Sequence, residues 1–271
     1  MCCLGTRCIE EKVSLRMKYL IERLKLIVRL LEAVIAPRRG HFEWAGRAFR
    51  VVRSIWWDES WQDNFNEEIV PYFKTLQGRS DYRVVVDVGA AVGLFSMAAA
   101  IMYPNAIIHA FEPSLRQRVL LRRNLRLNRL VDRIIVSSFG LWKCEDVLAF
   151  RTNGAISSLQ SMAQLPSSCL FLEKIPVIRL DRWAREAGLQ SVDLVKMDIE
   201  GAEIEALLGA EDTLRRYHPD LLVQAYHLRD ESRTFERCAA FLVACGYGCS
   251  EVGANTGMLF ATFRSADARG S

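Results

Sequence analysis

Short apolar runs alternate with stretches of helical spacing along most of the chain after residue 83. Runs rich in β-branched residues predict strands, and apolar residues that recur every three or four positions predict amphipathic helices. The predicted strands are 84–87, 106–111, 133–137, 176–180, 192–197, 221–225, 247–251 and 258–263, and the predicted helices start at 94 or cover 114–128, the segment around Trp183, 202–216 and 231–245. Residues 143–172 have no such regularity, apart from a strand-like piece at 147–150 and a polar turn at 152–158. The alternation predicts an α/β fold with a mostly parallel sheet covered by helices on both faces.

The pattern before residue 83 is different and divides the chain into three parts. Residues 12–36 have apolar positions three and four apart with Arg and Lys between them, which predicts a long amphipathic helix that stops at Pro37. We expect it to pack on its own domain or on a second subunit, as in a homo-oligomer; the alternative is a peripheral contact with an anionic membrane. Residues 1–40 are therefore an N-terminal helical extension, 41–82 a substrate-side or lid segment, and 83–271 the main domain.

The middle segment holds a strand-like pair around 43–51, a group of tryptophans and a helical pattern at 66–76. Trp56, Trp57 and Trp61 lie close enough together to form a lid over a substrate, although tryptophans so placed more often pack in a core.

Composition narrows the class of protein. The chain has 271 residues, of which 51% are hydrophobic and 25% charged, so it can bury a sizeable core. Its net charge of +4 is mild, and its basic segments at 12–39 and 116–133 have no aromatic stacking platform, so we do not expect a nucleic-acid substrate. Eight cysteines without a C-x-x-C pair indicate reduced thiols and a cytoplasmic protein, with membrane association through 12–36 as the variant.

The junction between the first strand of the main domain and its helix is built to hold a small molecule. Asp87 is followed by Gly89 and Gly93 with three small residues between them, and glycines let the backbone approach a ligand beside the free N–H groups of a helix start. Glu112 ends the next strand about 25 residues later, the distance at which a carboxylate meets a ribose. Because the loop lacks the middle glycine of the dinucleotide fingerprint, it suits a nucleoside without phosphates, of which S-adenosylmethionine (SAM) is the common one.

Other polar residues close apolar runs at the same edge of the predicted sheet. Ligands bind at the carboxyl ends of parallel strands. There Asp198 would face the amine of SAM or a hydroxyl of the substrate, Glu200 would either act or shape the loop, and Glu203 would be structural. His227 would accept a proton from an attacking alcohol, with Asp198 as the other candidate base. A divalent metal on Asp198, Glu200 and His227 is an alternative without a dense ligand motif behind it, so we expect no metal.

Four blocks in this order resemble the FkbM family of SAM-dependent methyltransferases. They are Asp87–Ser96, Ala110–Pro113 followed by Arg123–Asn128, Leu194–Glu203, and Leu221–His227. The resemblance implies a class I methyltransferase fold with a Rossmann-like, seven-stranded sheet, SAM as the cofactor, and methylation of a hydroxyl on a sugar, glycan or natural product. Carried over by position, the cofactor-binding residues are Asp87, Gly89, Ala90, Ala91, Gly93, Phe95, Glu112, Pro113, Ser138, Phe139 and Asp198, with Ser138 and Phe139 beside the adenine.

Two positions depart from the family pattern. Family members generally have Asn where this chain has Ala91, which removes a polar contact of the loop, and usually Glu where it has Gln224, which removes a charge near the reaction centre. These departures fit a non-catalytic SAM-binding relative that acts as an interaction protein. The sequence is also compatible with N-methylation, with nucleic-acid methylation and with a nucleotide-dependent oxidoreductase.

Overall fold

The computed structural model describes residues 17, 24, 38–53, 61–153, 156–160, 173–229, 232–253 and 256–264. The predicted helix at 12–36 lies outside these residues except for Met17 and Leu24, which are helical and exposed. Trp56 and Trp57 of the predicted lid also lie outside them. No helix among the described residues is long and apolar enough to cross a membrane.

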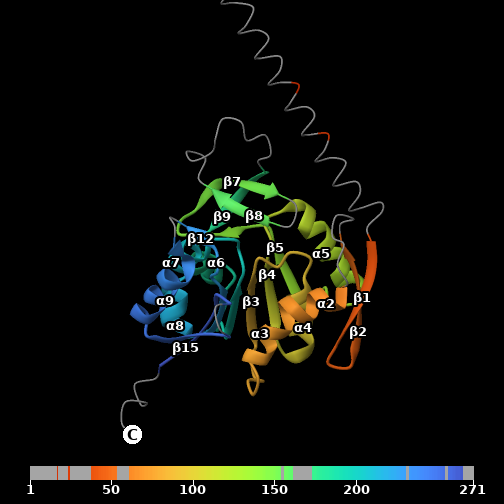
Figure 1. Cartoon of the computed structure of the whole chain (residues 1–271), viewed down its shortest axis with the longest axis horizontal. Coiled ribbons are helices and arrows are strands. Elements are labelled where there is room, and N and C mark those ends of the chain that lie inside the picture. The colour runs from red at the N-terminus through yellow and green to blue at the C-terminus, as the bar shows by residue number, and fades with distance from the viewer. Residues whose placement is uncertain are drawn as a thin grey trace, which may run out of the picture.

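A seven-stranded sheet forms the centre of the molecule (Figure 1). In spatial order its strands are β14 (Tyr247–Glu251), β15 (Met258–Phe263), β11 (Asp220–Gln224), β10 (Leu194–Met197), β3 (Val84–Val88), β4 (Ile107–Phe111) and β5 (Ile134–Ser137). Neighbours from β11 to β5 run parallel, whereas β15 is antiparallel to both β11 and β14. The predicted mostly parallel sheet is confirmed. The strand predicted at 176–180 is present as β9 (Glu173–Ile178), but it pairs in a separate sheet.

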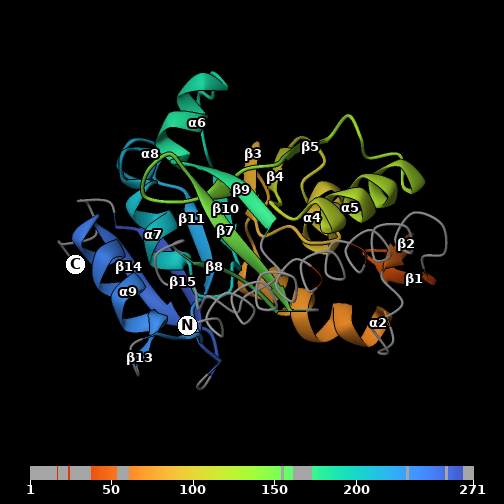
Figure 2. The same ribbon diagram turned by 90° about the horizontal axis from the view of Figure 1, so that it is seen from above.

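Helices cover both faces of the sheet, as predicted, because successive residues of each strand point to opposite sides. Val85 packs into the core on one face, whereas Val86 and Val88 pack into the core on the other. The first face carries η1 (Phe65–Ile69), α3 (Val70–Thr75), α4 (Leu94–Met102) and α5 (Leu115–Leu127), and the second carries α6 (Leu180–Glu186), α7 (Glu203–Leu208), α8 (Glu211–Tyr217) and α9 (Thr234–Ala244). Figure 2 shows the two groups on opposite sides of the strands.

The helix predicted at 202–216 is two helices, α7 and α8, that meet at Gly209. A Cβ atom on Gly209 would lie 2.0 Å from the carbonyl oxygen of Trp142. The backbone at Gly209 therefore packs directly on the backbone at Trp142. A continuous helix with side chains at this position would not allow this contact. The tertiary contact overrides the helical spacing of the sequence.

The segment before the main domain packs against α5. Strands β1 (Arg38–Trp44) and β2 (Arg47–Arg53) form the predicted hairpin, and α2 (Trp61–Asn64) leads into η1. The buried side chain of Asn124 on α5 accepts a hydrogen bond from Val52 N at 2.7 Å and donates one to the carbonyl of Val92 at 2.8 Å. This single amide therefore ties the hairpin, α5 and the glycine loop together.

Two small sheets complete the described fold. Residues 143–172, predicted to be irregular, contain β7 (Asp146–Asn153) and β8 (Ile156–Gln160), which pair with each other. β7 also pairs with β9, and β9 pairs with β6 (Gly140–Leu141) at the edge of this sheet. The polar residues predicted as a turn pair across this hairpin, as Thr152 with Ser157. Their hydroxyls leave no apolar alternation, which is the signal that sequence reasoning relies on. The other small sheet pairs β12 (Leu228–Arg229) with β13 (Ser232–Arg233).

Candidate active site

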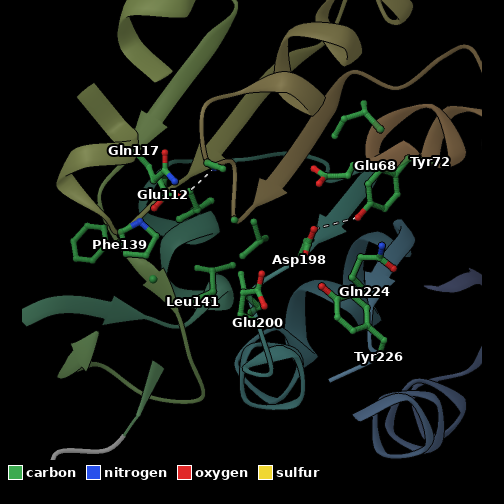
Figure 3. Close-up of a pocket in the computed structure, with 18 of the residues that line it drawn as sticks. Glu68, Tyr72, Glu112, Gln117, Phe139, Leu141, Asp198, Glu200, Gln224 and Tyr226 are labelled. Carbon is green, nitrogen blue, oxygen red and sulfur yellow. Dashed lines mark hydrogen bonds between the residues drawn. The ribbon is translucent and has the colours of Figure 1, made fainter. Parts of the chain in front are cut away.

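A cavity of about 380 Å³ opens at the carboxyl ends of β3, β4, β10 and β11. The ends of these four strands contribute Val88, Phe111, Asp198 and Gln224 to its wall. This is the edge at which ligands bind in parallel sheets. Figure 3 shows Glu112, Gln117 and Phe139 on one side of the cavity, and Glu68, Tyr72, Gln224 and Tyr226 on the other, with Asp198 between them.

The glycine loop lies directly against the loop that follows β10. Gly89 has φ +79°, and a Cβ atom there would lie 1.9 Å from the carbonyl oxygen of Asp198. Gly93 has φ +91°, and its Cβ would lie 2.3 Å from the side chain of Leu121. Glycine suits both positions because of their left-handed conformation, and at Gly89 it is also needed for the close approach of the two loops. The predicted strand, tight loop and helix start are confirmed here.

Ala91 occupies the position where the resembling family has Asn. Its φ is +47°, in the left-handed region that Asn tolerates better than Ala. Its N–H donates a hydrogen bond to Glu112 Oε2 at 2.8 Å. The backbone of Ala91 therefore holds the carboxylate in place, although its side chain offers the ligand no polar group.

Glu112 lies at the end of β4 and is 5% exposed. Its other oxygen accepts a hydrogen bond from Ser114 N at 2.8 Å, while Ser114 itself makes no side-chain capping bond to α5. Burial raises the pKa of Glu112 to about 7, against the lowering effect of these two N–H donors. A carboxylate has about four lone-pair positions, so each oxygen can still accept a hydroxyl. Two adjacent hydroxyls of a ribose would satisfy both oxygens.

The Glu112 side of the cavity has the chemical groups that a nucleoside needs. Phe111, Pro113, Phe139 and Leu141 line it beside Glu112 and offer apolar surface for a base, as Figure 3 shows for Phe139 and Leu141. No Lys, Arg or His is among the described residues that line it, so a pyrophosphate would meet no cation. The residues that would hold SAM are thus Gly89, Ala91, Glu112, Pro113 and Phe139.

Several residues predicted to bind the cofactor do not line the cavity. These are Asp87, Ala90, Gly93, Phe95 and Ser138. Asp87 is fully buried, where it accepts a hydrogen bond from Ser96 Oγ and lies 3.3 Å from Lys196 Nζ. Lys196 Nζ also donates to the carbonyl of Gly89 at 3.1 Å. Asp87 therefore supports the glycine loop from behind.

The side chain of Asp198 lines the cavity and lies between the two groups of residues in Figure 3. Tyr72 donates its hydroxyl hydrogen to Asp198 Oδ2 at 3.4 Å. Burial raises the pKa of Asp198, and the charges of Glu200 and Glu203 raise it further, while Lys196 lowers it. The carboxylate is accordingly a better proton acceptor than an exposed aspartate.

His227 does not line the cavity and is held between two carboxylates. Its Nε2 lies 2.8 Å from Glu200 Oε2, and its Nδ1 lies 3.4 Å from Glu203 Oε1. Burial lowers the pKa of His227, but the two glutamates outweigh burial and raise it to about 10. The imidazole is therefore protonated at neutral pH, a state in which it has no lone pair to accept a proton.

Glu200 and Glu203 differ in what they touch. Glu200 has φ +57° and lines the cavity, whereas Glu203 is fully buried and accepts a hydrogen bond from Gly201 N at 2.9 Å. Glu203, predicted to be structural, holds the backbone of the loop after β10 through this bond. In the part of the chain that the structure describes, no group of three His, Cys, Asp or Glu side chains is arranged to hold a metal.

Sequence reasoning missed the wall that η1 and α3 build. Glu67, Glu68, Ile69 and Tyr72 line the cavity, yet none of them was singled out. They belong to the segment 41–82, which was predicted as a substrate-side or lid segment with a helical pattern at 66–76. That pattern places Glu68 and Tyr72 on one helix face but does not say that this face meets the sheet edge. Gln117 on α5 and Tyr226 after β11 also line the cavity and were not singled out.

Comparison of the sequence with known proteins identifies the family of the chain. A family model described as the methyltransferase FkbM domain matches residues 87–249. The chain is 28% identical over 182 residues to the AMB antimetabolite synthetase AmbE of Pseudomonas aeruginosa, covering 54% of this chain and 8% of that protein. It is 28% identical over 156 residues to the 31-O-demethyl-FK506 methyltransferase FkbM of Streptomyces tacrolimicus, covering 48% of this chain and 60% of that protein.

A solved structure shares the fold. The crystal structure of a methyltransferase FkbM from Methylobacillus flagellatus superimposes with a TM-score of 0.51 at 20% identity, over 74% of this chain and 50% of that one. The seven-stranded sheet is thus that of the class I methyltransferases, as the resemblance implied. Since the matched family model spans more than half of the sequence and its first residue is Asp87 at the end of the glycine-loop strand, the chain belongs to the FkbM methyltransferase family.

Proposed function

We propose that the protein transfers the methyl group of SAM to a hydroxyl on a sugar, glycan or natural product. The observation that carries this proposal is that one cavity holds both Glu112, an acid placed for a ribose, and Asp198, an acid placed for a proton. The name of the Streptomyces relative, a methyltransferase of an O-demethylated natural product, supports a hydroxyl as the acceptor.

Binding and alignment are the main tasks of the protein in such a reaction. SAM, when bound, supplies an electrophilic methyl group on a sulfonium ion. Glu112 would bind the ribose hydroxyls, and the backbone of Gly89 and Ala91 would border the rest of the molecule. Holding donor and acceptor in contact replaces an encounter in solution, which can lower the barrier by several kcal/mol.

Asp198 is the residue that we propose as the proton acceptor. As the acceptor oxygen gains its methyl group, its proton would pass to a carboxylate oxygen of Asp198, whose raised pKa favours the transfer. The hydroxyl of Tyr72 would orient the carboxylate from the other side. His227, the other candidate base, would stay protonated and hold Glu200 in position.

Calorimetry followed by a methyl-transfer assay tests the proposal. The protein should bind SAM and S-adenosylhomocysteine, and radiolabelled methyl should move from SAM to a component of glycan or metabolite extracts. Asp198→Asn should keep SAM affinity within a few-fold but lower transfer by about 100-fold or more, the typical contribution of a general base. Absence of SAM binding would refute the assignment.

A non-catalytic SAM-binding protein is the second candidate, because no contact in the described structure compensates for the two departures from the family pattern, at Ala91 and Gln224. Ala91 keeps a left-handed backbone without the side chain that suits it, and Gln224 Oε1 is buried without a hydrogen-bond partner among the described residues. SAM binding without methyl transfer to any extract, and with Asp198→Asn indistinguishable from the natural sequence, would favour this second function.

A further inference from the structure

The wall formed by η1 and α3 comes from outside the part of the chain that the family model matches. Residues 65–75 precede residue 87, the first matched position, yet they supply Glu67, Glu68 and Tyr72 to the cavity. Figure 3 shows Glu68 and Tyr72 on the side of Asp198 that lies away from Glu112 and Phe139. The nucleoside would occupy the Glu112 side, so Glu68 faces the space that is left for the acceptor.

The carboxylate of Glu68 is held in its position by neighbouring contacts. Asn64, a buried residue one turn earlier, donates a hydrogen bond from Nδ2 to Glu68 Oε1 at 3.0 Å. Phe65 and Ile69 on either side are buried in the core and fix the helix. The hydroxyl of Tyr72, one turn later, binds Asp198. Glu68 is thereby linked through its own helix to the proposed proton acceptor.

The charges around this space are of one sign. Glu67, Glu68, Asp198 and Glu200 line it, and the described residues that line the cavity include no Lys, Arg or His. Two described cations behind the wall already have partners. Lys196 is paired with Asp87, and His227 with Glu200. A phosphate or carboxylate in this space would meet carboxylates, and no described residue that lines the cavity offers it a cation.

The hydroxyl groups of Tyr72 and Tyr226 are hydrogen-bond donors on this wall. Burial and the surrounding acids raise the pKa of Tyr226 and of Tyr72, so both hydroxyls keep their hydrogens. Tyr72 already donates to Asp198, and Tyr226 is half-exposed at the cavity. The wall is therefore rich in hydrogen-bond acceptors and holds few donors, which matches a ligand that mainly donates.

We propose that Glu68 binds the methyl acceptor directly, and that the acceptor meets it with hydroxyl or ammonium hydrogens and carries no phosphate or carboxylate beside the methylated oxygen. This inference rests on the proposed function, because it assigns the remaining half of the same cavity. Glu68 is then a residue that determines specificity, contributed by a part of the chain that the family model does not match.

Three related sugars of different charge test the inference. Glucose, glucosamine and glucose 6-phosphate would be titrated into the protein saturated with S-adenosylhomocysteine, with binding followed by saturation-transfer NMR. Glucose and glucosamine should bind at least ten-fold more tightly than the phosphate. Equal or tighter binding of the phosphate, or no binding of either of the other two sugars, would overturn the inference.

Variants of two acidic residues that are close in the sequence distinguish a direct contact by Glu68 from a general effect of negative charge. Glu68→Gln should weaken glucosamine binding at least five-fold, whereas Asp63→Asn, an exposed acid one turn earlier that does not line the cavity, should leave it unchanged. An equal effect of both variants, or no effect of Glu68→Gln, contradicts a direct contact.

The affinity of each variant for S-adenosylhomocysteine is measured first by calorimetry. It should match that of the natural sequence, because the nucleoside lies on the other side of the cavity. If no protein binds S-adenosylhomocysteine, the proposed function fails. If all bind it but the sugars do not discriminate, only the inference about Glu68 fails.

Discussion

Replacing His227 by Gln tests whether this residue is a buried cation or a base. Gln can still donate a hydrogen bond to Glu200, but it has no group that titrates. The change would leave Glu203, which is fully buried, without the positive charge that now lies 3.4 Å from it. Removing one partner from a buried ion pair costs about 3–5 kcal/mol, because the remaining charge is left in a poorly solvating environment.

The dependence of this loss on pH follows from the pKa of His227. That pKa is about 10 in the folded protein and ordinarily 6.5. A tenfold change in proton affinity corresponds to about 1.4 kcal/mol. The net rise in the pKa of His227 therefore adds at most about 5 kcal/mol to the free energy of unfolding. Because the folded-state pKa is the higher one, this contribution is complete below pH 6.5 and is lost as the pH rises through 10. Up to about 3 kcal/mol of it disappears between pH 6 and pH 9.

Urea unfolding followed by tryptophan fluorescence measures this difference. The quantity of interest is the free energy of unfolding of the natural sequence minus that of His227→Gln. We expect this difference to be about 1 to 3 kcal/mol larger at pH 6 than at pH 9. The lower figure allows for the desolvation of the carboxylates. His41→Gln, which changes an exposed histidine of β1, is the control and should show no such dependence. A stability difference that is the same at both pH values would refute the charged state, and His227 would return as a candidate base.

Three further predictions concern the nucleoside side of the cavity. Ala91→Asn should raise the free energy of unfolding by about 0.5–1 kcal/mol, measured by urea unfolding, because Asn tolerates the left-handed φ of +47°; a destabilised variant would contradict the strain. SAM affinity, measured by calorimetry, should fall by up to about ten-fold for each pH unit below the Glu112 pKa of about 7 and lose this dependence in Glu112→Gln; a flat profile in the natural sequence would exclude the ribose contact. Gly89→Ala should abolish SAM binding and lower the thermal midpoint, since its Cβ would lie 1.9 Å from the carbonyl oxygen of Asp198; normal SAM affinity would show that the two loops can separate.

The central sheet could be predicted from the sequence because its signals are local. Each parallel strand is a run of apolar residues that needs no knowledge of its partners, and the glycine loop is marked by Gly89 and Gly93 within a few residues of β3. The break at Gly209 could not be predicted, since its cause is the backbone of Trp142, which is far away in the sequence. Of the β7–β8 hairpin, only the piece at 147–150 was predicted as strand-like. The strand β8 was missed because polar residues such as Ser157 give no apolar alternation.

The site divides in the same way. Glu112 and Asp198 were found because each follows an apolar strand, and the parallel sheet brings such positions to one edge. The sequence also placed His227 at this edge, but it could not show that Glu200 and Glu203 lie on either side of the imidazole. That arrangement requires the loop after β10 to turn through positive φ at Glu200, a conformation that nothing in its composition marks apart from the following glycine.

The two halves of the cavity are therefore of different origin, and this bears on where specificity resides. The proposed nucleoside side is built by Gly89, Glu112 and Phe139, which follow the neighbouring strands β3, β4 and β5, so it is fixed by the same contacts that fix the sheet. The acceptor side depends on how α3 packs. Phe73 stacks on Phe95 with 5.2 Å between ring centres, and this contact brings the neighbouring Tyr72 to Asp198. Phe95 belongs to α4, the helix that follows the glycine loop, and it does not line the cavity. It therefore supports the acceptor side through its contact with α3 and not through a contact with the cofactor. Changes in residues 65–75 can then alter the acceptor while the cofactor side and the sheet stay as they are.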